Sequence, residues 1–165
     1  RRQPPETSLR LALPLLFLAA CDPTSEVACN AAAAEDGVLE IGTGADGFVP
    51  VADGDELAIQ TGGQGGHHVY GSLRASGVVQ GIFEGDSDPL VTFQVFDAEG
   101  TFLAGYEGWP RHFETEGDQL VHFGDTLILE VDPETLDGAE VTMVAQLEDA
   151  CGRVLEDERV VTLGW

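Results

Sequence analysis

The chain has 165 residues, of which 30 are acidic and 7 are basic, and its formal net charge is −23 at pH 7. This length is enough for one ordinary domain together with targeting and linker segments. So negative a surface keeps a protein soluble or attracts cations, and because it repels phosphate backbones it excludes nucleic-acid binding.

The first twenty residues have the pattern of an export signal. Arg1, Arg2 and Arg10 flank or precede the apolar run LALPLLFLAA at residues 11–20. Ten residues are too few to span a bilayer, but they suit the apolar region of a signal peptide. We therefore expect residues 1–20 to be removed on export.

The stretch LAAC, Leu18 to Cys21, resembles the lipobox of bacterial lipoproteins. The resemblance implies that Cys21 receives diacylglycerol and becomes the new amino terminus, so that the acyl chains hold the protein on the membrane. Two or three acyl chains anchor a protein far more firmly than one. We expect a location in the bacterial envelope, on the inner or the outer membrane, with residues 21–36 as an acidic tether and the domain outside the cytoplasm.

Two cysteines, Cys29 and Cys151, remain once Cys21 carries lipid. Leftover cysteines of an exported chain usually pair, because the compartment is oxidising. A bridge between them closes a loop of about 122 residues, worth on the order of 4 to 5 kcal/mol in the chain-entropy model. Shared metal ligation and a redox role are the alternatives, although no C-x-x-C motif supports the second.

From Gly37 onward the sequence has the pattern of short strands. Apolar runs alternate with Gly, Asp and Pro at intervals of about ten residues, without a sustained helical period. In VTFQVFD, Val91, Phe93 and Val95 share one face, as in a half-buried antiparallel strand. Tight turns are expected at 97–100 and 149–152. The predicted strands are 38–41, 56–61, 67–75, 78–84, 90–97, 101–106, 126–131, 139–148 and 153–163.

Residues 37–165 are therefore expected to form an all-β domain, an antiparallel two-sheet sandwich of seven to nine strands. The pattern of residues 125–163 resembles the closing strands of immunoglobulin-like or fibronectin-type domains, which makes that topology the first expectation. The core Cys, Trp, Cys set of true immunoglobulin domains is lacking, because Cys29 precedes the first strand. A jelly roll and a transthyretin-like sandwich are the alternatives.

The stretch GGQGGHHVYGSLR leads from a glycine-rich turn into a strand. If Val69 points to the core, His67 points inward with it, whereas His68 and Tyr70 point outward. Two such neighbours diverge and are poor ligands for one metal. Gln64, Gly65, Gly66 and His68 resemble a Gln-Gly-Gly-x-His stretch of bacterial envelope lipoproteins without an established activity, which supports the location alone.

For copper or zinc the candidate ligands are His67, His68, His112 and His122. The last two lie ten residues apart around a predicted turn, and could approach each other across a hairpin. Acidic turns at 52–56 and 85–89 offer oxygen atoms to calcium but lack EF-hand spacing, and are ordinary turn chemistry. GTGADG at 42–47 has no helix after it, which argues against a dinucleotide site.

No sequence motif of a hydrolase, P-loop or zinc protease occurs in the chain. We expect a protein without enzymatic activity or cofactor, whose sandwich binds an envelope protein or a glycan, or serves as a scaffold. The candidate binding surface consists of His68, Tyr70, Arg74 and Trp109. The alternative hypothesis is an envelope metal-binding protein that uses its histidines.

Overall fold

The computed structural model describes residue 29 and residues 36–80 and 88–165. Within this part, no helix is long and apolar enough to cross a membrane. One 3-10 turn, η1 (Pro133–Thr135), interrupts a succession of strands. The strands are β1 (Val38–Thr43), β2 (Val49–Pro50), β3 (Glu56–Ala58), β4 (Gln60–Thr61), β5 (His67–Ser76), β6 (Leu90–Asp97), β7 (Phe102–Pro110), β8 (Glu114–Glu116), β9 (Gln119–Ile128), β10 (Glu140–Glu148) and β11 (Val154–Gly164).

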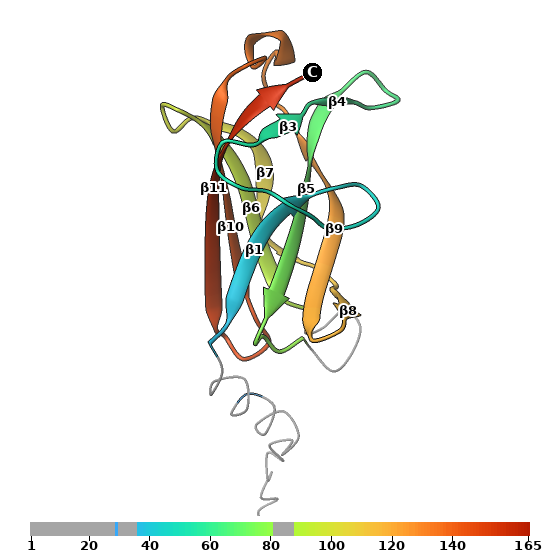
Figure 1. Cartoon of the computed structure of the whole chain (residues 1–165), viewed down its shortest axis with the longest axis vertical. Coiled ribbons are helices and arrows are strands. Elements are labelled where there is room, and N and C mark those ends of the chain that lie inside the picture. The colour runs from blue at the N-terminus through green and yellow to red at the C-terminus, as the bar shows by residue number, and fades with distance from the viewer. Residues whose placement is uncertain (1–28, 30–35, 81–87) are drawn as a thin grey trace, which may run out of the picture.

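The strands form two sheets that pack face to face, as Figure 1 shows. One sheet has the order β2-β1-β5-β9-β8, with β4 beside β5, and the other has the order β3-β11-β10-β6-β7. All pairs are antiparallel except β3 with β11. Reading β1, β5, β9 and β8 as A, B, E and D, and β11, β10 and β6 as G, F and C, gives the immunoglobulin arrangement. The predicted sandwich is confirmed, but the described residues form eleven strands, more than the seven to nine expected.

The core lies between the two sheets and follows the alternation of the strands. Val91, Phe93 and Val95 of β6 are fully buried, as the sequence predicts. On the adjacent β10, Met143 and Ala145 are fully buried too. The intervening side chains of both strands lie on the opposite face, toward solvent. Because this outer face carries polar residues, each strand has one buried and one solvated side.

The connection from β3 to β4 passes from one sheet to the other. The predicted strand 56–61 is therefore two short strands: Glu56 to Ala58 lie parallel to β11, and Gln60 pairs with β5 in the other sheet. Between them Ile59 is 5% exposed and packs in the core. The sequence shows one apolar run here because both halves contribute to the same core.

Two further predictions differ from the structure. The predicted strand 78–84 is absent over residues 78–80, and residues 81–87 lie outside the described residues. Strand β9 begins at Gln119, well before the predicted start at residue 126. Gly124 and Asp125 have the composition of a turn, but Gly124, with φ +81°, bends within the strand instead of ending it.

The predicted disulfide between Cys29 and Cys151 is present, with the two Cα atoms 5.5 Å apart. Cys151 lies in the β10–β11 turn, whose Asp149 side chain accepts hydrogen bonds from the backbone N–H groups of Cys151 and Arg153, each at 2.9 Å. In Figure 1 this turn and the start of β1 lie at one end of the sandwich, while the C-terminus lies at the other. The bridge thus attaches the segment before β1 to one end of the domain.

Candidate functional site

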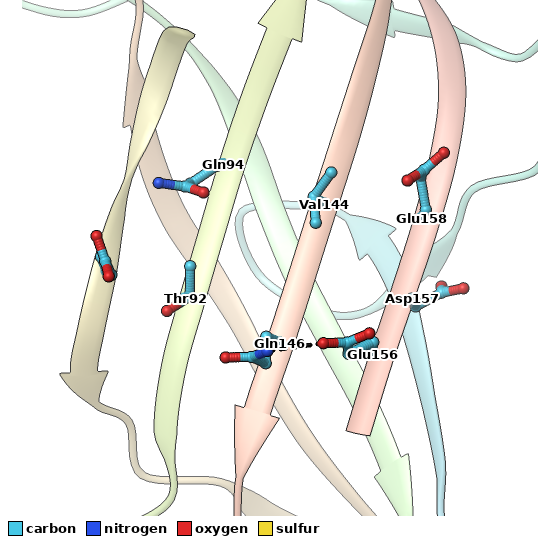
Figure 2. A pocket seen from close by; sticks show the side chains of 8 residues that line it. Thr92, Gln94, Val144, Gln146, Glu156, Asp157 and Glu158 are labelled. Carbon is cyan, nitrogen blue, oxygen red and sulfur yellow. Dashed lines mark hydrogen bonds between the residues drawn. The ribbon is translucent and has the colours of Figure 1, made fainter. Parts of the chain in front are cut away.

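The outer face of the five-stranded sheet is hollowed into a shallow groove of about 550 Å³ (Figure 2). Its lining comes from β6, β7, β10 and β11, which present Thr92, Gln94, Glu107, Val144, Gln146, Glu156, Asp157 and Glu158. We call this feature the sheet groove. Strand register explains the arrangement, since residues at matching positions of neighbouring strands share one face. Gln94 lies opposite Val144, and Val144 lies opposite Glu158. Two residues along the strands, a second row consists of Thr92, Gln146 and Glu156.

Apolar side chains border the groove at both ends of the strands. Toward the β10–β11 turn, Val154 and Leu90 are 47% and 43% exposed and lie on either side of the exposed Glu148 of β10. Pro110 lies opposite Leu90 on β7. Toward the other end, Phe96 packs edge to face with Phe102, with ring centroids 6.1 Å apart. Both phenylalanines are half-buried on the outer face. The face is therefore polar and acidic in the middle and carries apolar side chains at its two ends, with Glu148 between those at the turn end.

Several groove side chains have no partner within the described part of the chain. Gln146 Nε2 donates to Glu156 Oε1 at 2.7 Å, the bond drawn in Figure 2. Asp157 is engaged at the sheet edge, where it accepts a hydrogen bond of 2.7 Å from the backbone N–H of Ile41. By contrast, the side chains of Gln94, Glu107 and Glu158 form no hydrogen bond or ion pair with the described residues; Arg159 donates only to the backbone carbonyl of Glu158. The groove thus offers free acceptors and donors to solvent.

Among the described residues, the acidic side chains of the groove form no ion pair with an arginine, with the exception of Asp157. Each arginine of the described residues forms an ion pair with one acidic residue: Arg74 with Glu40, Arg111 with Asp125, Arg153 with Asp149 and Arg159 with Asp157. The sequence has no lysine. Glu107, Glu156 and Glu158 therefore make the groove negative.

A second group of side chains, the seam cluster, joins the two sheets at the edge formed by β7 and β9. It consists of Tyr106, Trp109, Arg111, His122 and Asp125. The Tyr106 hydroxyl donates to Asp125 Oδ2, Arg111 Nε donates to the same carboxylate at 3.1 Å, and His122 Nε2 lies 3.2 Å from it. The Arg111 guanidinium carbon lies 4.3 Å from the centroid of the Tyr106 ring, and the Tyr106 and Trp109 rings are stacked at 5.6 Å.

The seam cluster shifts the pKa values of its own members. Burial raises the pKa of Tyr106 far above its ordinary value, and the hydrogen bond to Asp125 and the charge of that carboxylate raise it further. Burial acts to raise the pKa of Asp125 as well, but hydrogen bonds with His122 and Tyr106 and the charges of His122 and Arg111 outweigh it, so this pKa is lowered. Tyr106 stays neutral and Asp125 charged, as a structural contact requires.

Trp109 is the exposed member of the seam cluster, with 56% of its surface accessible. Its indole contacts both the Tyr106 ring and the Arg111 guanidinium, whose carbon lies 5.3 Å from the Trp109 centroid. A cation near an aromatic ring restricts and stabilises it. The predicted binding residue Trp109 is thus a fixed aromatic surface at the seam, on the sheet that also carries the groove.

The other three residues of the predicted binding surface lie on the opposite sheet. His68, Tyr70 and Arg74 follow one another along the outer face of β5, as the alternation predicts. His68 is only 9% exposed, since the glycine-rich turn at 62–66 lies against it and Tyr70 packs edge to face on its ring. Arg74 is engaged with Glu40 and with the Phe48 ring. The four predicted residues therefore do not form one patch.

The predicted metal ligands do not converge. His67 and His68 point to opposite faces, and the His67 ring packs against Trp165. His112 Nδ1 contacts Gln80 and Asp88 at 3.3 Å, while His122 Nδ1 lies 2.9 Å from the His112 carbonyl. Across residues 29, 36–80 and 88–165, no group of three or more His, Cys, Asp or Glu side chains could hold a metal ion.

The acidic turn at 52–56 has turn chemistry. Asp55 Oδ2 accepts from the Ala52 N–H at 2.8 Å, and Asp53 Oδ1 accepts from the Val160 N–H at 2.9 Å. These bonds hold the β2–β3 connection against the edge of β11. Of the second acidic turn, residues 85–87 lie outside the described residues.

No protein-family model and no curated protein matches this chain.

Most residues of the groove could be predicted from the sequence to face outward from their strands. The outward positions of the predicted strands 90–97, 139–148 and 153–163 include Thr92, Gln94, Gln146, Glu156 and Glu158. The sequence could not show that these three strands are neighbours. Nothing in the sequence pattern indicated Asp125 as a site residue, because the pattern places it in a turn before a strand rather than inside β9.

Proposed function

We propose that this protein is a lipid-anchored protein of the bacterial envelope, and that its sandwich is a binding or scaffold module without enzymatic activity. In this proposal Cys21 carries the lipid, and the partner is an envelope protein or a glycan. The sheet groove is the surface that meets the partner.

The observation that carries the binding role is the state of the groove side chains. Gln94, Glu107 and Glu158 lie in a concave surface of about 550 Å³, and their side chains make no hydrogen bond or ion pair among the described residues. A monomeric domain gains nothing in stability from such groups, whereas a partner can satisfy them. Concave surfaces with free hydrogen-bonding groups are the usual form of a binding site.

The seam cluster supports a binding role rather than catalysis. Its titratable groups engage one another: Asp125 accepts hydrogen bonds from Tyr106 and Arg111, and those bonds join β7 to β9. A general base needs a free lone pair at the reacting proton, near neutral pH. Neither Tyr106, whose pKa is raised, nor Asp125, whose pKa is lowered, meets that requirement.

The disulfide gives the anchor a defined geometry. Cys21 lies about eight residues before Cys29, which the bridge holds at the β10–β11 turn. Fully extended, that length of chain spans at most roughly 28 Å. A lipid on Cys21 would therefore keep this end of the sandwich close to the membrane. The groove would lie along the side of the sandwich, and the C-terminus would lie at the end farther from the membrane.

The anchor is tested by fractionating the native host and by intact mass spectrometry. Wild-type protein should occur in the membrane fraction, start at Cys21 and carry the added mass of its acyl chains. Cys21→Ser should remove the added mass and release the domain from the membrane. A wild-type Cys21 without lipid would contradict the proposal.

A further inference from the structure

The outer face of the five-stranded sheet has three zones in series. Along β6, Leu90 belongs to one apolar end, Thr92 and Gln94 to the groove, and Phe96 to the other apolar end. Six residues of an extended strand cover about 20 Å. A ligand that fits the whole face therefore meets apolar surface at both ends and negative charge between them.

The negative zone indicates the charge of the ligand. Glu107, Glu156 and Glu158 line the groove, and the four arginines of the described chain pair with other acidic residues. A neutral glycan that covered these carboxylates would take them out of water without supplying a counter-charge, which is costly. A cationic group would be attracted to the groove, where it could donate hydrogen bonds to the three carboxylates.

The two apolar zones indicate the size and class of the ligand. A metal ion or a small polyamine would leave Leu90 and Val154 at one end, and Phe96 and Phe102 at the other, exposed to water as before. A polypeptide can place apolar side chains at both ends and a cation in the middle. Six residues of extended chain have the length that the face requires.

We infer that the sheet groove binds a protein segment that carries Lys or Arg at its centre and apolar side chains on both flanks. The inference rests on the proposed function, and names the partner class for that same surface. Glu107, Glu156 and Glu158 receive the cationic side chains, Gln94 and Gln146 bind polar groups beside them, and the ends around Leu90 and Phe96 receive the flanks.

A displayed library of 12-residue peptides tests this inference on the full-length protein held in nanodiscs. Binders are selected on the wild type and counter-selected on Gln94→Trp, which fills the groove without a change of charge; Gln94→Arg provides an independent block. The enriched peptides should carry Lys or Arg in the middle and Leu, Ile, Val or Phe at both flanks. Their affinity is then measured by fluorescence anisotropy at low and high salt.

The charge variant removes three carboxylates at once: Glu107→Gln, Glu156→Gln and Glu158→Gln. It should weaken the selected peptides at least about tenfold, because three partly exposed ion pairs are lost. The control removes three other carboxylates near β8, on the second sheet: Glu114→Gln, Glu116→Gln and Asp118→Asn. It changes the net charge equally and should alter affinity less than about twofold. Thermal unfolding verifies that each variant is folded.

Two results would overturn the inference and leave the proposed function in place. One is enrichment of groove-binding peptides without a cationic centre, or with unchanged affinity for the charge variant. The other is a neutral oligosaccharide, found on a glycan array, whose binding Gln94→Trp blocks. If neither a peptide nor a glycan binds at the groove, both the inference and the proposed binding surface are wrong.

Discussion

The Tyr106 hydroxyl of β7 donates a hydrogen bond to the Asp125 carboxylate of β9, and this contact joins the two sheets at one edge of the sandwich. At the opposite edge the backbone N–H of Ile41 in β1 donates to Asp157 of β11. Each edge is thus closed by a carboxylate that accepts a hydrogen bond from the other sheet. Closed edges also protect a sandwich against pairing with further strands.

Replacing Asp125 by Asn should lower the free energy of unfolding by about 2 to 3 kcal/mol, because Arg111 loses its charged partner and Tyr106 loses a strong acceptor. Urea unfolding followed by Trp fluorescence measures the change. Glu114→Gln, an exposed carboxylate on the neighbouring β8, is the control and should stay within about 0.5 kcal/mol. Equal effects of the two substitutions would show that the seam contacts contribute nothing specific.

Asp125 should also contribute to the acid sensitivity of the fold. Because its pKa is lowered in the folded protein, its stabilisation is present above the ordinary Asp value near 3.9, and is lost as the pH falls below that value. Unfolding curves collected between pH 6 and pH 2 should therefore show a smaller loss of stability in Asp125→Asn than in the wild type below about pH 4. Parallel curves would exclude Asp125 as a source of acid sensitivity.

The Tyr106 hydroxyl should resist ionisation. Its raised pKa means that the folded state holds the proton above the ordinary tyrosine value near 10, so the stabilisation is lost only as the pH rises beyond that value. Ultraviolet titration resolves this readily, since the sequence has only two tyrosines, Tyr70 and Tyr106. Tyr106→Phe should abolish the late transition and leave the other. A single step near pH 10 with two tyrosines ionising would contradict the seam geometry.

The alternation of apolar residues was enough to predict the sandwich, because Val91, Phe93 and Val95 repeat with the period of a strand and are buried together. Tyr106, Trp109 and Arg111 were grouped from the sequence, where they are close together, but their contact with Asp125 was not predicted. Tyr106 and Asp125 lie on β7 and β9, whose edge-to-edge position depends on the packing of two sheets, and no local pattern encodes that position. The groove was predictable in part. The alternation shows which of its residues face outward, but it does not show which strands lie next to one another.

Gly105 bends β7 beside the seam cluster. Its φ is +132°, and a Cβ at this position would lie 2.1 Å from the Phe93 carbonyl oxygen, within the strand pairing itself. Gly105→Ala should therefore cost about 2 kcal/mol or more, and weaken the contact between Tyr106 and Asp125. Gly63→Ala is the matched control, because it has open space around it and no positive φ. Chemical denaturation of both variants provides the comparison.

The disulfide should affect both the stability of the domain and the largest distance between the domain and a lipid on Cys21. Cys29→Ser with Cys151→Ser removes a link across 122 residues and should cost about 4 to 5 kcal/mol in the chain-entropy model. If Cys21 carries lipid, as we propose, the same change moves the last point attached to the sandwich from residue 29 to the start of β1 at Val38. The largest distance from the lipid roughly doubles, because the free chain doubles in length.

Energy transfer from a donor in the β10–β11 turn to an acceptor dye in the bilayer measures that distance. Transfer should fall in the double serine variant and in wild type treated with a reductant, but not in a variant that retains the bridge. Unchanged transfer on reduction would contradict the proposal that the disulfide limits the distance between a lipid on Cys21 and this end of the sandwich.

The most direct test of the central claim is photo-crosslinking in living cells of the native host, with a photoreactive phenylalanine at Gln94 in the sheet groove. The account predicts a discrete adduct in the membrane fraction from this position, and none from Thr115, an exposed position on β8 of the other sheet. The same adducts from both positions, or no adduct from Gln94, would contradict the claim that the groove is a binding surface.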